Sequence, residues 1–422
     1  MLLSGVASGG FLPPEAVTDG AGQDQLARNP TKAIAIDVDG RLHLAYWRGG
    51  SVTTVAEPSY VLYRGWSVGS GWSAEEIVDD SFIGPDRLGG RSPSLAIDAR
   101  GDLWLAWHDH RHSTALQGYI DNLEIYADVR LSSGGGFSSI DLRLTTTAAG
   151  GAGDNGYLPM LAPHVDGSLS VAWYDFTADA AVSDIYLKQS DASGAFNLAE
   201  PVSSLRVTNK DDRGGSPAFT VADLSVDATG RRHLAWATGT SAAGADIYYA
   251  SASTGSVAAS PQAISTGTSS FFDTPRVLAA ATGDVWIYWS DSSNASDKEI
   301  RLRRLRAGEA TFDAVTTPEP AAGSQVQPAL AIGAAGDMHF AWIDEPTNRV
   351  VYRHYPSPGA PADGTETIAA GTGPLQRIAM TLNADGRPHL VIEESLGFTA
   401  RRLWHARPTD AEMGVDGWNL YK

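Results

Sequence analysis

The sequence contains no cysteine in its 422 residues. This excludes a disulfide framework, a thiol nucleophile and cysteine metal ligands. No apolar run approaches the roughly 20 residues that a membrane-spanning helix needs, so we expect no membrane insertion. The opening stretch, MLLSGVASGG, has neither the basic start nor the apolar core of a signal peptide. We expect a bacterial extracellular or periplasmic protein whose export signal, if it has one, is not in the numbered chain.

Basic clusters are also missing. Asp and Glu number 49 against 31 Lys and Arg, which gives a net charge of −18, and no basic run interrupts this acidic background. Binding to nucleic acid depends on clustered Lys and Arg, so we expect no nucleic-acid partner. An anionic membrane surface is disfavoured for the same reason.

Long amphipathic helices and polar linkers are absent as well. Apolar residues instead alternate at a period of two in short runs, which Gly, Pro, Asp and Asn interrupt, as is typical of an all-β protein. A chain of this length usually forms two or three domains. Because no linker divides it, we expect a single domain over residues 1–422.

A repeat of two strands joined by a glycine turn runs through the chain, as in IAIDVDGRLHLAYW and LAIDARGDLWLAWHD. The seven turn glycines lie 50 to 66 residues apart: Gly40, Gly101, Gly167, Gly230, Gly283, Gly336 and Gly386. Six residues after each comes an aromatic residue or, in the last copy, isoleucine: Tyr46, Trp107, Trp173, Trp236, Trp289, Trp342 and Ile392. We expect a two-residue hairpin turn, in which glycine adopts positive φ at no steric cost. Because both sets of alternating side chains are largely apolar, both faces of each sheet are expected to be buried.

Each unit continues with a third strand, for example EIYADVRL, and most have a fourth after a glycine turn. Seven units of four antiparallel strands predict a seven-bladed β-propeller. The blade cores are expected near residues 31–80, 91–146, 157–209, 217–266, 273–317, 326–370 and 375–422. Segment 4–18 matches the fourth strand of the second unit, so we expect it to close the ring against the C-terminal strands. The C-terminal GWNLYK, residues 417–422, is a competing candidate for that place.

The pattern of a proline, LAIDARGDLWLAWHDHR and then EIYADVRLSSGGGF resembles the repeats of sialidase-like propellers, the Asp-box superfamily. In that family a Ser-x-Asp-x-Gly-x-x-Trp turn joins the third and fourth strands. Here SDASGAF, residues 190–196, comes nearest, and SSGGGF lacks the aspartate. The resemblance covers nearly the whole chain and implies the fold. It leaves the activity open, because such repeats occur in sialidases, other glycosidases, polysaccharide lyases and proteins without known activity.

The resemblance also implies which residues a sialidase would carry: three arginines that grip a carboxylate, a Tyr–Glu pair and an aspartic acid. Arg28, in ARNP, and Arg91, in GRSP, stand in places comparable to that of the first arginine. The remaining set is not identifiable, so we do not expect sialidase activity itself.

The position two residues after the repeat aromatic lies at one mouth of the ring and is mostly acidic. Its occupants are Arg48, Asp109, Asp175, Thr238, Asp291, Asp344 and Glu394. A carboxylate that recurs in this way favours a structural role, in which it accepts hydrogen bonds from the following loop. The alternative is a ring that binds Ca²⁺ or a cationic substrate group. Ca²⁺ is the one cofactor that this alternative would involve. We assign no residues to a metal site.

The stretch HDHRH, residues 108–112, does not recur in the other units. It opens the longest loop of its kind, which also carries Tyr119 and Asp121. In a continued strand the three histidines would face one way, and Asp109 and Arg111 the other. Three interpretations stay open: a zinc site completed by another strand, a histidine general base beside Arg91 or Arg111, and a merely polar loop.

Four further histidines are expected to be structural. They share the position three residues after the turn glycine, where two other units have tryptophan: His43, His233, His339 and His389. Separately, the loops before the innermost strands bring polar residues to the same mouth: Arg91, Asp154, Asn155, Tyr157, Asp211, Arg213 and Arg276.

These patterns predict a propeller that binds or cleaves a polysaccharide or other glycan at its central mouth. The catalytic candidates are Asp109, His110, Arg111, Tyr119 and Asp175. The substrate-binding candidates are Arg48, Arg91, His108, His112, Asp121, Arg213, Asp291 and Asp344. A lyase would use a histidine or tyrosine base with an arginine, and a glycoside hydrolase would use two carboxylates across the mouth. The alternative is a non-catalytic propeller that serves as a lectin-like or protein-interaction scaffold.

Overall fold

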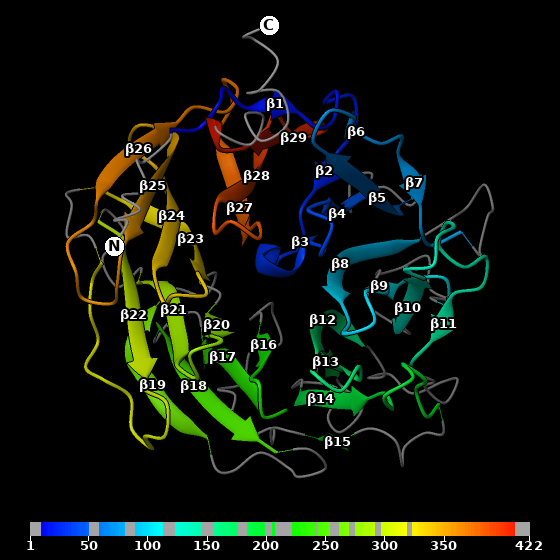
Figure 1. Cartoon of the computed structure of the whole chain (residues 1–422), viewed down its shortest axis with the longest axis horizontal. Helices are drawn as coiled ribbons and strands as arrows, with labels where there is room; N and C mark the ends of the chain where they lie inside the picture. The colour runs from blue at the N-terminus through cyan, green and yellow to red at the C-terminus, as the bar shows by residue number, and fades with distance from the viewer. Residues whose placement is uncertain are drawn as a thin grey trace, which may run out of the picture.

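Seven small antiparallel sheets stand around a central axis as the blades of a propeller (Figure 1). The computed structural model describes residues 10–49, 59–80, 89–112, 123–145, 156–175, 184–198, 205–206, 222–240, 244–253, 261–269, 275–291, 297–318 and 323–409. Within these residues five sheets have four strands, the blade-1 sheet has six and the blade-5 sheet has three. The expected all-β, seven-bladed propeller is confirmed.

The strands of each blade follow the chain outward from the axis. The innermost strands are β3 (Ile34–Ile36), β8 (Gly90–Ile97), β12 (Tyr157–Pro163), β16 (Asp223–Val226), β20 (Arg276–Ala279), β23 (Gln325–Ile332) and β27 (Leu375–Leu382). The second strands are β4 (Leu42–Arg48), β9 (Leu103–Asp109), β13 (Leu169–Asp175), β17 (Arg232–Thr240), β21 (Val285–Asp291), β24 (Met338–Asp344) and β28 (Pro388–Ser395).

The outer half of each blade is more variable. The third strands are β5 (Tyr60–Ser67), β10 (Glu124–Arg130), β14 (Asp184–Gln189), β18 (Gly244–Ala252), β22 (Glu299–Leu305), β25 (Arg349–Tyr355) and β29 (Arg401–Ala406). The outermost strands are β6 (Gly71–Trp72), β7 (Glu76–Ile77), β11 (Leu142–Arg143), β15 (Leu205–Arg206), β19 (Gln262–Ser269), β26 (Gly364–Ile368) and β1 (Glu15–Ala16). In blade 5 the described residues show only a single bridge, from Leu302 to Thr316, at the corresponding place.

The hydrophobic core lies between the blades. It divides into seven clusters, and each cluster combines side chains from two neighbouring blades around the ring. The repeat aromatics sit in these seams; Trp107, for example, is fully buried between blades 1 and 2. Both faces of a blade are therefore apolar because each faces another blade, as the sequence pattern predicts.

The glycine turns differ from the two-residue hairpin that the sequence predicts. In blade 1 the Gly40 N–H donates to the Asp37 carbonyl at 3.0 Å, and the Asp37 N–H donates to the Arg41 carbonyl at 3.0 Å. This pattern is a three-residue loop in which the glycine, at φ 78°, follows a tight turn. Positive φ is confirmed at all seven turn glycines. The prediction of a two-residue turn was wrong. A two-residue loop and a three-residue loop both require glycine at this position, so the glycine alone does not distinguish them.

The N-terminal segment closes the ring, as expected. Strand β1 pairs with β29 as the outermost strand of blade 7, with Glu15 opposite His405. Val17 continues into the core cluster between blades 7 and 1. The competing C-terminal segment 417–422 lies outside the described residues. Among the described residues, no helix is long and apolar enough to cross a membrane.

Candidate functional site

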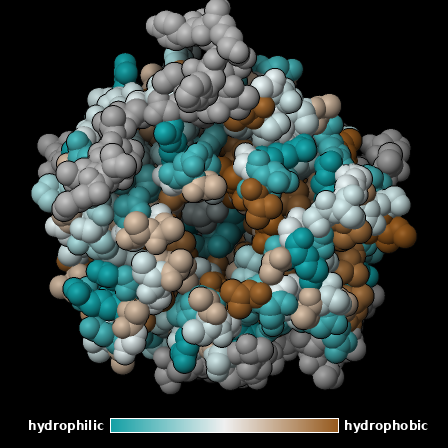
Figure 2. All heavy atoms as spheres, viewed as in Figure 1, coloured by the Kyte–Doolittle hydropathy of each residue, from teal (hydrophilic) through white to brown (hydrophobic). Residues whose placement is uncertain are grey.

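The innermost strands begin, and the second strands end, on one face of the ring, because the two run antiparallel. In blade 2, for example, Gly90 pairs with Asp109. We call the centre of this face the mouth, and the opposite face, which carries the seven glycine turns, the turn face. Seen down the axis, the ring is hollowed at its centre, and hydrophilic residues form part of the wall (Figure 2).

Bulges occur near the start of four innermost strands, β8, β12, β23 and β27, and those of β8 and β12 shape the mouth beside His108. The register of β8 shifts between Arg91 and Ser94, and that of β12 shifts between Tyr157 and Met160. The residue after Arg91 and the residue after Tyr157 both have φ 51°. Gln327 in β23 has the equivalent conformation, with φ 54°, so this bulge is a recurrent feature of the blades that re-aims the side chains around it.

A short segment of blade 1 spans the centre of the ring (Figure 1). Here the innermost strand is interrupted: β2 (Asp24–Gln25) and β3 both pair with β4, and the 3₁₀ helix η1 (Pro30–Lys32) lies between them. Asn29 caps η1, and its Nδ2 donates a 2.7 Å hydrogen bond to Asp223 Oδ1 in blade 4. From blade 5, Arg276 donates to the Arg28 carbonyl at 3.4 Å. The segment therefore joins blades 1, 4 and 5 across the axis.

Two arginines and a tyrosine influence one another beside this segment. Burial raises the pKa of Tyr157 to about 12, while the positive charges of Arg28 and Arg91 oppose that rise. Burial also lowers the pKa of Arg28, and the nearby Arg377 adds to the effect. Arg91 is buried and stacks over Trp47 at 5.4 Å. The mouth thus concentrates positive charge in a protein whose net charge is −18.

His108 and His110 lie next to these groups. Arg91 is the register partner of His108, and the His108 ring lies 5.3 Å from that of Tyr157 and 5.7 Å from that of His110. Both histidines are buried. Within the described part of the chain, neither ring nitrogen of His110 has a hydrogen-bond partner, and Nδ1 of His108 has none.

Both histidines are held in the neutral form. Burial, followed by the nearby His110, Arg91 and Arg28, keeps the pKa of His108 well below its ordinary value. Burial and then Arg91 lower the pKa of His110 to about 3, although Asp109 opposes this. Neutral imidazoles beside arginines can accept a proton from a bound molecule.

The rest of the HDHRH stretch turns away from the mouth. Strand β9 ends at Asp109, so the alternation expected from a continued strand stops there. His112 instead accepts or donates a 2.6 Å hydrogen bond with Tyr126 OH. Arg111 pairs with Asp109 at 2.7 Å and with Asp141 at 2.6 Å. Burial opposes its charge, but these two partners raise the pKa of Arg111 above its ordinary value. Arg111 and His112 therefore hold the outer part of blade 2.

The mostly acidic residues two positions after the repeat aromatics, which we call the acidic ring, bind loops and tryptophan side chains within their own blades. Asp109 and Asp175 each accept a 3.0 Å hydrogen bond from the repeat tryptophan of their own blade. Glu394 accepts from two backbone N–H groups, at 2.7 and 2.6 Å, and from Trp404 at 2.8 Å. The other members described are also bound locally: Arg48 to Asp24 and Glu75, Asp291 to Arg301, and Asp344 to Thr347.

The structure brings together His108, His110 and Arg91 from the candidate residues. Tyr119, Asp121 and Arg213 lie outside the described residues, as do Asp154, Asn155 and Asp211. No group of three metal ligands gathers at the mouth among the described residues; the one such group lies in blade 6, on the turn face. The contacts of Asn29 with Asp223, and of Arg377 with Glu393 at 3.0 Å, have no signal in the sequence.

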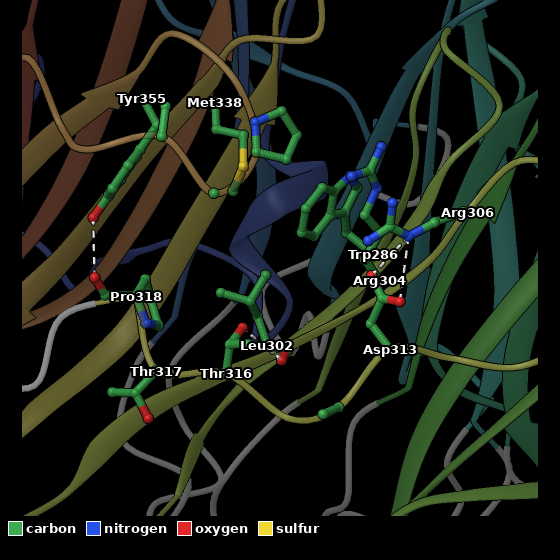
Figure 3. A pocket seen from close by; sticks show the side chains of 14 residues that line it. Trp286, Leu302, Arg304, Arg306, Asp313, Thr316, Thr317, Pro318, Met338 and Tyr355 are labelled. Atoms are coloured by element: carbon green, nitrogen blue, oxygen red, sulfur yellow. Dashed lines mark hydrogen bonds and ion pairs between the residues drawn. The ribbon is translucent and has the colours of Figure 1, made fainter.

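A separate hollow of about 370 Å³ lies between blades 5 and 6, near the turn face (Figure 3). Its charged groups bind one another: Arg306 pairs with Asp313 at 3.2 Å, and the Arg304 guanidinium stacks on Trp286 at 5.3 Å. The Tyr355 hydroxyl donates to the Pro318 carbonyl at 3.3 Å. The residues that line this hollow therefore bind one another and stabilise the seam between blades 5 and 6.

The chain folds as a seven-bladed β-propeller, and its fold is similar to those of several solved carbohydrate-active propellers. No protein-family model and no functionally curated protein matches the sequence. Among solved structures, the polysaccharide lyase Uly1 is 11% identical over 94% of this chain and 99% of its own, with a TM-score of 0.60. A PL25 ulvan lyase bound to -[GlcA(1-4)Rha3S]- is 13% identical over 93% and 94%, with a TM-score of 0.58. The Hadza microbial sialidase Hz136 is 12% identical over 84% and 73%, with a TM-score of 0.50. At these identities the likeness concerns the fold.

Proposed function

We propose that this protein cleaves an acidic polysaccharide at the mouth by β-elimination next to a uronate. The observation that carries the proposal is the meeting of Arg91, two buried neutral histidines and Tyr157 at one place. The bulged strands β8 and β12 aim two of these groups. The similarity to solved polysaccharide lyases supports the same chemistry, since one of them is bound to an oligosaccharide that contains glucuronate.

Arginine charge serves both binding and catalysis in this proposal. A uronate carboxylate beside Arg91 and Arg28 would be held by charge-assisted hydrogen bonds, which are stronger than neutral ones. During elimination, negative charge develops on the carboxyl group as the adjacent proton leaves. A fixed positive charge in a buried site stabilises that charge without reorganisation.

The reaction requires one base and one acid. A neutral imidazole, His108 or His110, takes the proton from C5 of the uronate. The electron pair forms the C4–C5 double bond, and the C4–oxygen bond breaks. Tyr157, which stays protonated because its pKa is about 12, gives its proton to the departing glycosidic oxygen. The bound carboxylate offsets the positive charge of Arg91, which is a smaller cause than burial of the low histidine pKa. Its own negative charge favours the protonated imidazole that forms as the base takes the proton.

Hydrolysis would need two carboxylates that face each other across a sugar. The candidates for that role, Asp109 and Asp175, accept indole N–H hydrogen bonds within their own blades. Their availability to a substrate stays a prediction. A lectin-like role is the other alternative. It is less favoured because the histidine pair occurs in blade 2 alone, whereas a multivalent lectin would repeat its binding residues.

The proposal extends to location. A polymer that cannot enter a cell must be cut outside it, so an extracellular or periplasmic site of action fits this chemistry. Ca²⁺ stays a proposed ligand of the carboxylates two residues after the repeat aromatics, and no step above uses it.

The test is turnover on a panel of uronate-containing polysaccharides, read by the absorbance of the unsaturated uronate and by new reducing ends. Wild type is compared with the variants His108→Ala, His110→Ala and Tyr157→Phe. His233→Ala, a buried histidine of blade 4 on the turn face, is the matched control. We expect the mouth variants to lose activity by about 10²-fold or more while His233→Ala retains it. Reducing ends without the absorbance, or equal activity in all variants, would contradict the proposal.

A further inference from the structure

Three blades share a buried histidine whose two ring nitrogens are both bound. The Nδ1 atoms lie 2.7–2.8 Å from a tyrosine hydroxyl of the third strand, in the pairs His43–Tyr63, His233–Tyr249 and His339–Tyr352. The Nε2 atoms lie 3.0–3.2 Å from an aspartate, in the pairs His43–Asp37, His233–Asp227 and His339–Asp337. In blades 1 and 4 this arrangement is part of the scaffold.

Blade 6 departs from the arrangement at three positions. The aspartate six residues before the histidine is replaced by Gly333, and the carboxylate comes from Asp337, only two residues before His339. A Cβ atom at Gly333 would lie 2.2 Å from Asp337 Oδ1, so the glycine makes room for this carboxylate. Opposite the repeat histidine, the third strand carries His354, where blades 1 and 4 have Gly65 and Ser251.

Blade 6 also lacks a basic side chain that blades 1 and 4 have near the repeat histidine. In blades 1 and 4 the position two residues before the histidine is Arg41 or Arg231, and both guanidinium groups are close enough to lower the pKa of the neighbouring histidine. Blade 6 has the acidic Asp337 at that position. The site has therefore lost a positive side chain and gained a carboxylate and an imidazole.

The new groups converge on one point. Asp337 Oδ2 lies 3.0 Å from His339 Nε2 and 3.4 Å from His354 Nε2, and all three ligand atoms lie within 4.8 Å of one another. Zinc bonds of about 2.0–2.1 Å in a tetrahedron separate neighbouring ligands by roughly 3.3 Å. The two separations from Asp337 are close to this value, and the two imidazole nitrogens lie within 4.8 Å of each other.

The outer partners fix the orientation of both imidazoles. Asp363 lies 2.9 Å from His354 Nδ1, and the Tyr352 hydroxyl lies 2.7 Å from His339 Nδ1. When Asp363 accepts the Nδ1 proton of a neutral His354, Nε2 presents its lone pair to a carboxylate oxygen, and either a second proton on the imidazole or a bound cation relieves that repulsion. Histidine ligands of zinc usually donate their other N–H to a carboxylate or similar group in the same way.

We propose that Asp337, His339 and His354 bind one divalent metal ion, with Zn²⁺ as the ion that two imidazoles and a carboxylate suit best. The site is independent of the mouth, because it lies on the turn face at the seam of blades 6 and 7. It borders a cavity of about 820 Å³ that also includes Glu366 and Asn383. The cavity gives the ion access and leaves a fourth position for water or another ligand.

The test is zinc binding by the full chain. Protein stripped with a chelator is dialysed against buffered Zn²⁺, and bound metal is measured by elemental analysis and calorimetry. We expect one ion per wild-type chain and a loss of affinity of about 100-fold or more in His354→Gln, since even outer partners of zinc ligands contribute 10- to 100-fold. His233→Gln is the matched control, because blade 4 has the same histidine, tyrosine and aspartate without a second imidazole. It should bind zinc as wild type does.

A second readout separates binding from folding. Zinc should raise the Tm of wild type and of His233→Gln but leave that of His354→Gln and Asp337→Asn unchanged. Co²⁺ in place of Zn²⁺ should give a visible absorption band in wild type but not in His354→Gln. Wild type that binds no more zinc than His354→Gln, or His354→Gln that binds as tightly as wild type, would overturn the proposal.

Discussion

The Asn29 side-chain amide donates a 2.7 Å hydrogen bond to Asp223 Oδ1, although 194 residues separate the two. Asn29 and Asp223 are both buried, and Lys32 Nζ lies 4.0 Å from the same carboxylate oxygen. This contact ties blade 1 to blade 4 through the centre of the ring. The segment that carries it, residues 28–32, also brings Arg28 to the mouth.

Removal of this amide should destabilise the protein. Asn29→Ala leaves a buried carboxylate without one of its donors, which typically costs about 1–3 kcal/mol. Urea denaturation followed by tryptophan fluorescence measures the change. Ser138→Ala, which removes an exposed hydroxyl, is the control and should have no effect beyond about 0.5 kcal/mol. An unchanged midpoint in Asn29→Ala would show that the cross-ring contact does not stabilise the fold.

Because the N-terminal segment closes the ring, truncation of one of its buried side chains should lower the stability of the protein. Val17 is 2% exposed in the core between blades 7 and 1, so Val17→Ala should lower the free energy of unfolding by about 2 kcal/mol. Val38 provides the same substitution at 94% exposure and should be neutral. Equal stability of the two variants would mean that the closing segment is not bound in solution.

The buried neutral His110 predicts a dependence of stability on pH. Its pKa falls from 6.5 to about 3 on folding, so the unfolded chain binds the proton first as the pH drops. Stability from this source is fully present above pH 6.5 and is lost progressively between pH 6.5 and about 3. At pH 4.5 the loss is about 2–3 kcal/mol, since one pKa unit corresponds to about 1.4 kcal/mol.

His110→Gln removes this titration. The difference in unfolding free energy between wild type and variant should therefore shift in favour of the variant as the pH falls from 7 to 4.5. Denaturant curves at several pH values measure this difference, and other buried histidines cancel because both proteins contain them. Parallel pH profiles would mean that His110 is not buried in the neutral form.

The role of Arg91 predicts a specific response to a conservative change. Arg91→Lys keeps the charge but loses the planar fork that binds a carboxylate through two hydrogen bonds. Under the proposed function, kcat/KM on the uronate polymer should fall by about 10²-fold, with little change in Tm. Arg130→Lys is the control. Arg130 pairs with Glu76 at 2.9 Å and lies away from the mouth. Full activity in Arg91→Lys would remove this arginine from the reaction.

Local patterns made most of the fold predictable. Each turn glycine and each repeat aromatic, such as Gly101 and Trp107, follows from constraints within a dozen residues, and their repetition reveals the ring. The resemblance of segment 4–18 to another outer strand also correctly placed the closing strand. The type of turn was not predictable, because a two-residue loop and a three-residue loop both place glycine at positive φ.

The site was predictable only in part. His108 and His110 stood out because they break the repeat, and Arg91 stood out through the resemblance to the sialidase-like repeats. The bulges after Arg91 and Tyr157, and the contact from Asn29 to Asp223, depend on backbone register and on packing across the ring, which no short pattern records. His354 was missed for a related reason: its partner His339 looks like the structural histidines of other blades, and the pairing becomes visible only once strands β24 and β25 are aligned.

The mass of the reaction products tests the central claim most directly. Wild type is incubated with a glucuronate-containing polysaccharide, and the released oligosaccharides are examined by mass spectrometry. We predict non-reducing ends that carry an unsaturated uronate, each oligosaccharide lighter by one water than its hydrolytic counterpart, and their loss in His110→Ala. Oligosaccharides of the hydrolytic mass, or unsaturated products from His110→Ala at the yield of wild type, would contradict the account of the mouth.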